Sequence, residues 1–381
     1  MEKPVYLDYN ATTTIDPEVA TEMLPYLQTH FGNPSSSYSI GRHNKEAVER
    51  AREQVANLIN AKPEEIIFTS GGTESNNHAI RGIAFANKDK GKHIITSSIE
   101  HPAVTEVCIY LNSLGYEITW LPVDTFGAVN PGDVENAVRP DTVLITIMHA
   151  NNEVGTIQPI EEIASIAHQK NIVLHTDAAQ SAGKIHTDVA MPGIDLLTIA
   201  GHKLYAPKGI GALYIKQGIK VENLIYGAGQ ERGIRPGTEN VIQIVGLGKA
   251  CEIAKRDFDK NHQNMLSMRD RLLNGLRNIL GDKVNVNGNL GNSLPNTLSI
   301  VFDKVEAHAF ASFISNDVLI STGSACHSGN TEISSVLKAM NVDIMTAAST
   351  VRISTGKNTT VKEIDFAVDI VFKAFFKLSS K

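Results

Sequence analysis

The sequence predicts an α/β protein with two domains, a large one built on a mostly parallel sheet and a smaller α+β one. Over residues 65–215, short apolar segments of strand length alternate with segments of helical periodicity. This alternation is typical of a parallel sheet that helices cover on both faces. Beyond about residue 280 short strands mix with helices instead, and 381 residues are enough for two apolar cores.

The N-terminal elements follow from caps and spacing. Residues 5–14 are polar and rich in turn formers after a two-residue apolar start. Asp16 followed by Pro17 predicts a helix start, because aspartate caps free amides and proline suits the first turn. A loop is expected at 31–38 and a helix at 44–60. The alternating part is predicted to contain strands at 65–70, 93–97, 117–122, 142–148, 171–176, 195–200 and 211–215, and helices from 71 onward and at 103–113, 133–138 and 161–169.

The C-terminal part begins with a helical pattern from Asn240 to about Leu280. This is long for one helix, so we predict a break near Arg256, where the two domains meet. The pattern after it predicts strands at 296–302, 318–321 and 350–354, and helices at 307–315, 334–340 and 361–378.

Composition excludes several classes of function. The net charge is −6 and the pI is near 6.1, so there is no electrostatic case for a nucleic-acid partner. No apolar run approaches the roughly 18 residues of a membrane span, and the N-terminus lacks a signal-peptide pattern. Three widely spaced cysteines do not make a disulfide framework. We therefore expect a cytoplasmic protein with no membrane partner and no metal site.

Polar side chains that could bind a ligand or take part in catalysis follow five of the predicted strands. Ligands of such sheets bind beyond the carboxyl ends of the strands. One site is therefore expected there. The residues at these positions are Thr73, His101, Asn151 with Asn152, Asp177 and Lys203.

Lys203 lies between two short apolar strands, with glycines at 201 and 209 beside it. A partly desolvated lysine loses its proton more easily and becomes an amine nucleophile that can form a Schiff base. The alternative is an ordinary charged loop residue, since most lysines are solvated. The nucleophile hypothesis requires two further groups in the chain: a carboxylate for a pyridinium nitrogen and an amide cradle for a phosphate.

Both groups are present. Asp177 follows an apolar strand and could hold a pyridinium nitrogen, although it could also be a helix cap. Gln180 could reach the same ring. Gly71 and Gly72 separate a strand from a helix, which predicts free amides for a phosphate or, alternatively, a plain glycine turn. His101 could stack on a ring and move protons, or be structural. The glycine-rich loop at 227–240 and the segment 246–249 match neither a dinucleotide fingerprint nor a P-loop.

The chain resembles the class V aminotransferase-like cysteine desulfurases, which use pyridoxal phosphate, and the related selenocysteine lyases. The matches run in order along nearly the whole chain. They are Leu-Asp-Tyr-Asn-Ala-Thr-Thr at 7–13, Phe-Thr-Ser-Gly-Gly-Thr-Glu-Ser-Asn at 68–76, Glu-His at 100–101, Asn-Asn-Glu-Val-Gly at 151–155, His-Thr-Asp-Ala-Ala-Gln at 175–180, Gly-His-Lys at 201–203, Arg-Pro-Gly-Thr at 235–238, Gly-Ser-Ala-Cys at 323–326 and Val-Arg at 351–352.

The resemblance implies the type I pyridoxal-phosphate fold, like that of aspartate aminotransferase, in a homodimer. Residues 14–255 are expected to form the cofactor-binding domain, and residues 1–13 with 256–381 the small domain. For the cofactor ring, the resemblance implies Lys203 as Schiff-base lysine, Asp177 at the pyridinium nitrogen, His101 as stacking acid or base, and Asn152 and Gln180 near the ring hydroxyl. For the phosphate, it implies Gly72, Thr73 and His202, with Thr238 at the partner subunit's phosphate. For the substrate, it implies Asn10, Asn152 and Arg352. Ala200 stands where many desulfurases have serine, which removes one phosphate contact.

The three cysteines differ in their surroundings. Cys108 and Cys251 lie in helical apolar segments and are expected to be small core residues. Cys326 lies in a loop of glycine and serine, which suits a mobile nucleophile, and His327 beside it could help ionise it. The segment is expected to form a long, swinging loop.

The resulting prediction is a cysteine desulfurase that forms a persulfide on Cys326 and passes sulfur to an acceptor such as an iron–sulfur scaffold protein. The alternative is a selenocysteine lyase acting on L-selenocysteine. An ordinary aminotransferase would have no use for Cys326. A non-catalytic adaptor that binds sulfur carriers would have no use for the intact set of cofactor residues.

Overall fold

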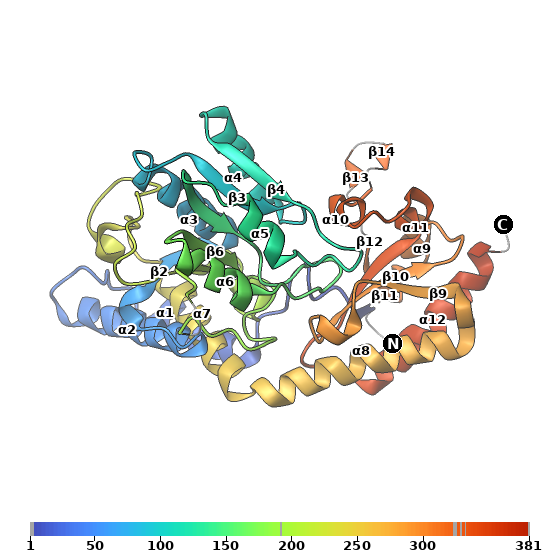
Figure 1. The fold of residues 1–381 in the computed structure, drawn as a ribbon. Coiled ribbons are helices and arrows are strands. Elements are labelled where there is room, and N and C mark those ends of the chain that lie inside the picture. Colours follow the sequence, from blue (N-terminus) through green and yellow to red (C-terminus); the bar gives the residue numbers. More distant parts are fainter. Residues whose placement is uncertain (1–3, 191–192, 323–325, 328–329, 332, 380–381) are drawn as a thin grey trace.

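The computed structural model describes residues 4–190, 193–322, 326–327, 330–331 and 333–379. A large domain and a small domain lie side by side in Figure 1, and the N-terminal segment runs from the small domain to the large one. The predicted α/β class is confirmed, because a seven-stranded mixed sheet is covered by helices. Its strands are, in spatial order, β2 (Ile66–Thr69), β8 (Gly211–Ile215), β7 (Leu196–Ala200), β6 (Val173–Asp177), β5 (Thr142–Thr146), β3 (His93–Ser97) and β4 (Glu117–Leu121).

The sheet is mostly parallel, with one exception. β8 runs antiparallel to both of its neighbours, β2 and β7, while the other pairs are parallel. Consecutive strand residues point to opposite faces: Ile94 belongs to one apolar cluster and Ile95 to another. Both faces of β2, β3, β5, β7 and β8 are buried, so these strands lack the alternation of buried and exposed positions seen in a sheet covered on one face; the edge strand β4 is partly exposed.

Helices cover the two faces of this sheet (Figure 1). One face packs against α3 (Gly72–Ala86) and α4 (Pro102–Ser113). The other packs against a group that includes α2 (Ser39–Leu58), α6 (Ile160–Gln169) and α7 (Val241–Arg256). The remaining helices of this part are α1 (Pro17–Gln28), which starts at the predicted Asp16 cap, and α5 (Pro131–Ala137).

The small domain is built on a four-stranded antiparallel sheet in the order β12 (Ser321–Thr322), β15 (Thr350–Ser354), β10 (Thr297–Phe302), β9 (Val284–Asn287). Helices α8 (Phe258–Leu280), α9 (Ala307–Ile314) and α12 (Val361–Ser379) share its apolar cluster. Val5 and Leu7, from the start of the chain, are buried in the same cluster. The exact domain boundaries, 14–255 and 1–13 with 256–381, stay a prediction.

The predicted break near Arg256 is confirmed, since α7 ends at Arg256 and α8 begins at Phe258. The strand predicted at 318–321 is instead two short strands. β11 (Val318–Leu319) pairs in parallel with β1 (Val5–Tyr6), whereas β12 pairs antiparallel with β15, so the chain changes partner at Ile320. β1 and β9 were not predicted, because their segments are short and largely polar around the apolar residues.

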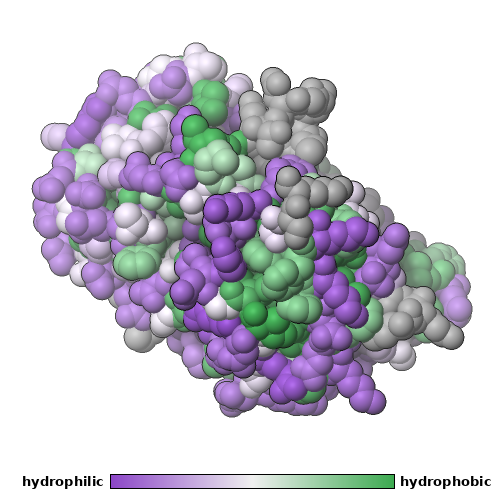
Figure 2. All heavy atoms as spheres, turned by 90° about the vertical axis from the view of Figure 1, so that its right-hand side faces the viewer, coloured by the Kyte–Doolittle hydropathy of each residue, from purple (hydrophilic) through white to green (hydrophobic). Residues whose placement is uncertain are grey.

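The remaining elements lie near the top of the small domain in Figure 1: β13 (Cys326–His327), β14 (Asn330–Thr331), α10 (Ser335–Ala339) and α11 (Ile344–Ala348). Figure 2 views the molecule from the small-domain end, which is mostly hydrophilic, with a hydrophobic area near the centre of the view and smaller ones elsewhere. Exposed apolar residues of this domain include Ile344, Met345 and Phe376. Within the described part of the chain, no helix combines the length and apolarity needed to cross a membrane.

Candidate active site

A cavity of about 440 Å³ lies where the sequence predicted a site, beyond the carboxyl ends of the parallel strands. Its wall is completed by the N-terminal segment and by β15 of the small domain. The cavity brings together ten of the predicted site residues. They are Asn10, Gly72, Thr73, His101, Asn152, Asp177, Gln180, His202, Lys203 and Arg352.

Lys203 follows β7 at the end of a short 3₁₀ turn, Gly201–Lys203. Its Nζ donates to the backbone carbonyls of Asn10 and of Ala11, the latter at 2.8 Å. Burial lowers the pKa of Lys203 to about 8, and the positive charge of Arg352 acts in the same direction. A useful fraction of this amine is therefore unprotonated at neutral pH, as a nucleophile or a base requires.

Asp177 ends β6 and is only 6% exposed. Its Oδ2 accepts a hydrogen bond from Asn76 Nδ2 at 2.7 Å, and its Oδ1 accepts one from the amide of Ala179 at 2.9 Å. Among the described residues it has no cationic partner within 4.0 Å. A buried carboxylate whose partners in the chain are neutral donors is suited to pair with a cationic group of a ligand in the cavity.

The corner between β2 and α3 forms the amide cradle. Gly71 has φ of +149°, a conformation that side-chain-bearing residues rarely adopt. The first amides of α3, at Gly72 and Thr73, have no partner inside the helix, and Gly71 has no side chain to cap them. A Cβ added at Gly72 would lie 3.2 Å from Cβ of Ala200, so the cradle has little spare room on this side.

His202 lies beside the cradle, with its Nδ1 3.2 Å from Thr12 Oγ1. Burial, together with the charge of Lys203, lowers the pKa of His202 to about 4, so the ring is neutral near pH 7. A neutral imidazole can offer one N–H to an anion without adding a charge.

His101 is the cap of α4, and its Nδ1 accepts a hydrogen bond from the amide of Ala103 at 3.1 Å. Accepting at Nδ1 places the ring proton on Nε2. Desolvation lowers the pKa of His101, although Asp177 opposes this change. His101 is therefore a neutral aromatic ring at the cavity wall, able to stack on a flat ligand and to exchange a proton through Nε2.

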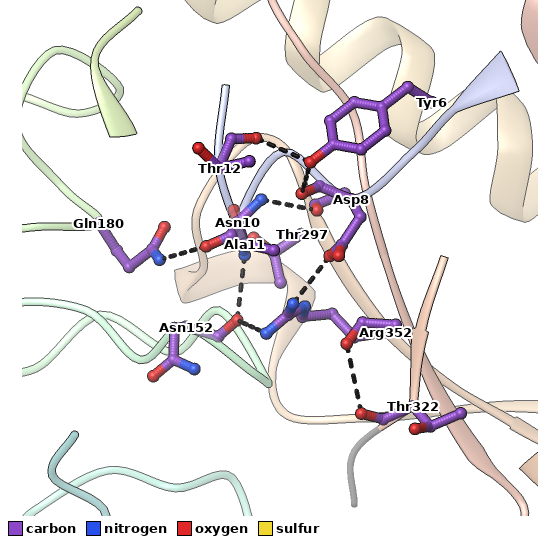
Figure 3. Close-up of polar contacts among 12 residues, drawn as sticks. Tyr6, Asp8, Asn10, Ala11, Thr12, Asn152, Gln180, Thr297, Thr322 and Arg352 are labelled. Atoms are coloured by element: carbon purple, nitrogen blue, oxygen red, sulfur yellow. Dashed lines mark hydrogen bonds and ion pairs between the residues drawn. The ribbon is translucent and has the colours of Figure 1, made fainter. Parts of the chain in front are cut away.

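Arg352 supplies the guanidinium of the site from β15, on the small-domain side (Figure 3). Its Nη2 donates to Asp8 Oδ1 at 2.8 Å, and its Nη1 donates to the carbonyl of Asn152 at 3.3 Å. Its Nε is buried and has no hydrogen-bond partner among the described residues. An unsatisfied donor on a planar guanidinium at a cavity is suited to a ligand carboxylate.

Asn10 has every polar group engaged. Its side chain is buried, and its Nδ2 donates to the carbonyl of Asn152 at 3.1 Å and to Thr297 Oγ1 at 2.8 Å. Its Oδ1 accepts from Asn296 Nδ2 at 2.9 Å and from Lys184 Nζ at 3.2 Å, and its amide donates to Ser354 Oγ at 2.9 Å. Figure 3 shows part of this arrangement, in which Gln180 also reaches the carbonyl of Asn10.

Two predicted site residues remain, Thr238 and Cys326. Thr238 is exposed on the loop between β8 and α7 and does not line the cavity of the described chain. The backbone of Cys326 is paired with that of Thr331 in the β13–β14 hairpin, but its side chain lies outside the described residues, so the predicted swinging loop stays a prediction. Cys108 and Cys251 are buried, and burial raises the pKa of the Cys108 thiol to about 12.

The structure also adds residues that sequence reasoning missed. Asn76, Asp8 and Lys184 contact predicted site residues directly. Asn76 could have been singled out, because α3 carries polar residues, including Ser75 and His78, on a face that is buried against apolar strands. Polar residues on such a face need partners, and here the partner is Asp177.

Comparison with known proteins assigns nearly the whole chain to one family. The family model described as Aminotransferase class-V matches residues 5–366. The chain belongs to the class V aminotransferase family. It is 48% identical over 379 residues to the cysteine desulfurase IscS of Dictyoglomus turgidum, covering 99% of this chain and 96% of that relative. It is 47% identical to the IscS of Methanosarcina thermophila, covering 99% and 93%.

Solved structures agree with this membership. A NifS-like protein superposes with a TM-score of 0.93 at 37% identity, covering 98% of this chain and 100% of that chain. A structure titled SspA in complex with cysteine superposes with a TM-score of 0.83 at 38% identity, covering 93% and 100%. The type I pyridoxal-phosphate fold expected from the sequence is thereby confirmed.

Membership of this family implies pyridoxal phosphate as the cofactor, and the residues fit this group. The free amides at Gly72 and Thr73 suit a phosphate, the buried Asp177 suits a protonated ring nitrogen, and Lys203 suits an aldehyde. Across the described residues, no group of three or more histidine, cysteine, aspartate or glutamate side chains could hold a metal ion.

Proposed function

We propose that this protein is a pyridoxal-phosphate-dependent cysteine desulfurase, which converts L-cysteine to L-alanine and transfers the sulfur to Cys326. The observation that carries the proposal is the single cavity that holds an amine of lowered pKa, a buried carboxylate and a partly unsatisfied guanidinium, at Lys203, Asp177 and Arg352. The similarity to cysteine desulfurases named IscS supports the choice of substrate.

The cofactor would be held by Lys203 through its aldehyde, by Asp177 at its ring nitrogen, and by Gly72, Thr73 and His202 at its phosphate. Asn152 and Gln180 would lie at its ring hydroxyl. When bound, it supplies an electron sink for the carbon that loses a proton. Since Ala200 carries no hydroxyl, the amides of the cradle would hold the phosphate without a contribution from that position.

The substrate would be oriented by Arg352, whose guanidinium receives the α-carboxylate, with Asn152 and Asn10 in the same wall. Lys203 in its unprotonated form removes the α-proton, a role that its lowered pKa permits. His101, with its proton on Nε2, assists proton movement at the cavity wall.

Sulfur transfer needs a second nucleophile, which we assign to Cys326. Its thiolate attacks the substrate sulfur, so an S–S bond forms while the C–S bond breaks. The electron pair stays with the substrate carbon, which takes up a proton as alanine forms. Cys326 is left as a persulfide, and the terminal sulfur passes to an acceptor protein such as an iron–sulfur scaffold.

The active form is proposed to be a cytoplasmic homodimer. Thr238 is exposed and does not line the cavity of its own chain, which is the arrangement expected if it contributes to the phosphate site of a second copy of the chain. Two-fold dimers are the commonest closed assemblies. Sedimentation as a dimer is expected, and a fully active monomer would contradict this shared site.

The test compares alanine release from L-cysteine by the wild type and by Cys326→Ser, with mass spectrometry for a persulfide on Cys326. The variant should bind pyridoxal phosphate normally and make almost no alanine, and Cys251→Ala, which changes a buried cysteine, is the matched control. Unchanged alanine release by Cys326→Ser would contradict the proposal. A strong preference of the wild type for L-selenocysteine would instead favour a selenocysteine lyase.

A further inference from the structure

Lys184 is a buried lysine that the mechanism above does not use. Its side chain is 5% exposed, four residues after Gln180, and it lies outside the lining of the active-site cavity. Among the described residues no carboxylate lies within 4.0 Å of its Nζ. Burying an ammonium group without an anionic partner is costly, so a packing role alone would be served better by methionine or leucine.

Both hydrogen bonds of Lys184 Nζ go to residues of the active site. Nζ donates to Gln180 Oε1 at 2.8 Å and to Asn10 Oδ1 at 3.2 Å. An ammonium group has three donors and no acceptor. When Lys184 is protonated, the amide atoms that face it must therefore be oxygens, which fixes the orientation of both carboxamides.

This orientation decides what Gln180 can offer to a ligand. With Oε1 bound by Lys184, its Nε2 donates to the carbonyl of Asn10 at 2.9 Å. An NH₂ group has a second proton, and Gln180 lines the cavity. Gln180 can thus present a donor to the cavity but not an acceptor.

We propose that Lys184 is a positioning residue of the active site, which locks the Gln180 carboxamide so that only its N–H side faces the ligand. This inference rests on the proposed cofactor: the ring oxygen of pyridoxal phosphate, placed near Gln180, would be held as an acceptor and therefore in its anionic form. Without Lys184 the amide can rotate, offer Oε1, and favour the protonated ring hydroxyl.

The electrostatic surroundings act in the same direction. Lys203 and Arg352 lie towards the active-site cavity, and Nδ1 of His262 in α8 lies 2.9 Å from the carbonyl of Lys184. Tyr205 and Lys357 line the same small cavity as Lys184. Burial, with the charges of Lys203 and Arg352, lowers the pKa of Lys184 to about 7. Removing its cation should raise the pKa of nearby groups, Lys203 included.

The test uses two readouts that need no substrate. One is the pH titration of the absorbance of bound pyridoxal phosphate. The other is the pH dependence of acylation of Lys203 in the cofactor-free protein, followed by mass spectrometry. In Lys184→Met both midpoints should rise by about one pH unit, a tenfold change in the proton equilibrium. The matched control is Lys357→Met, which removes another buried lysine, paired with Asp16, and should move neither midpoint.

Action through Gln180 is tested by a double-mutant cycle. Gln180→Leu should shift the absorbance titration by itself. Adding Lys184→Met to it should then cause a smaller shift than Lys184→Met causes alone, because only the electrostatic part of its effect remains. Fully additive shifts, or a Lys184→Met titration equal to that of the wild type, would overturn the proposal. Failure of the wild type to make alanine from cysteine would defeat only the proposed function.

A second variant keeps the test decisive if Lys184→Met does not fold. Gln180→Glu retains the cation and gives it a carboxylate, so the fold should persist. Because a carboxylate has no N–H, the absorbance midpoint should still rise. An unchanged midpoint in Gln180→Glu would overturn the proposal.

Discussion

The two walls of the cavity are held in different ways. On the large-domain wall Asp177 and His101 are fixed by groups of the same domain: Asp177 by Asn76 and the amide of Ala179, and His101 by the amide of Ala103. Lys203 is the exception, because its Nζ donates to carbonyls of the N-terminal segment. On the opposite wall the contacts join segments that are distant in sequence, as between Arg352 and Asp8. Asp177 and His101 are therefore held within one domain, whereas the second wall exists only when the N-terminal segment and the small domain are in place.

This difference separates two kinds of contribution to the reaction. The large-domain wall carries the groups that hold the cofactor and move protons, so changes there should lower kcat. The opposite wall carries the guanidinium for the substrate, so changes there should raise KM while cofactor binding persists. Four variants or conditions test this division.

Lys203→Ala should have the largest effect, because it removes both the nucleophile and the proposed base. Alanine formation should fall by at least about 10³-fold, the scale of positioned acid–base catalysis. The variant should also lose the covalent link to pyridoxal phosphate that borohydride fixes in the wild type. Lys208→Ala, an exposed lysine in the following turn, is the control. Near-normal turnover by Lys203→Ala would remove the basis of the proposed mechanism.

Asp177→Asn should come next. The substitution keeps the size of the side chain but replaces a buried anion with a neutral group, so the ring nitrogen loses the charge that favours its protonation. We expect kcat to fall about 100-fold and cofactor affinity to weaken, while KM changes little. Asp195→Asn, at a carboxylate that accepts from the amide of Leu174 outside the cavity, should leave both unchanged. If both substitutions lowered kcat equally, the effect would reflect impaired folding and not a specific role of Asp177 in catalysis.

Arg352→Gln tests the opposite wall. A hydrogen bond to a charged group contributes about 1.5–3 kcal/mol, so KM for L-cysteine should rise about 10-fold to 100-fold. The absorbance of the bound cofactor should stay close to that of the wild type. Arg271→Gln, which breaks an exposed pair with Asp365, should change neither value. A fall in kcat with constant KM would place Arg352 among the groups that act on the transition state.

The smallest expected effect is that of Arg352→Gln on the pH dependence of pyridoxal-phosphate binding. The amine of Lys203 reacts in its unprotonated form, so the rate of pyridoxal-phosphate uptake by the cofactor-free protein should rise with pH and level off above a midpoint near pH 8. Removing the charge of Arg352 favours the protonated amine, so Arg352→Gln should move this midpoint upward by a few tenths of a unit. A midpoint above pH 10 in the wild type would show that Lys203 is not desolvated.

The groups on the large-domain wall could be predicted from sequence because local pattern determines them. Lys203, Asp177 and His101 each follow an apolar strand, and parallel strands bring such positions to one edge. Lys184 could not be predicted in this way. It resembles any helix- or loop-borne lysine, and its burial depends on Asn10 and on His262, which are far away in the sequence. The split of the predicted strand at 318–321 has the same origin, since β11 pairs with the distant β1.

The connections of Asn10 also set an order of events during synthesis of the chain. Its partners include Asn296, Thr297 and Ser354, which the ribosome makes near the end. Val5 and Leu7 are likewise buried against C-terminal elements. Contacts of such long sequence separation form late. The large-domain sheet can therefore fold before the first residues have found their C-terminal partners. Both walls of the cavity are complete only after β15 has left the ribosome.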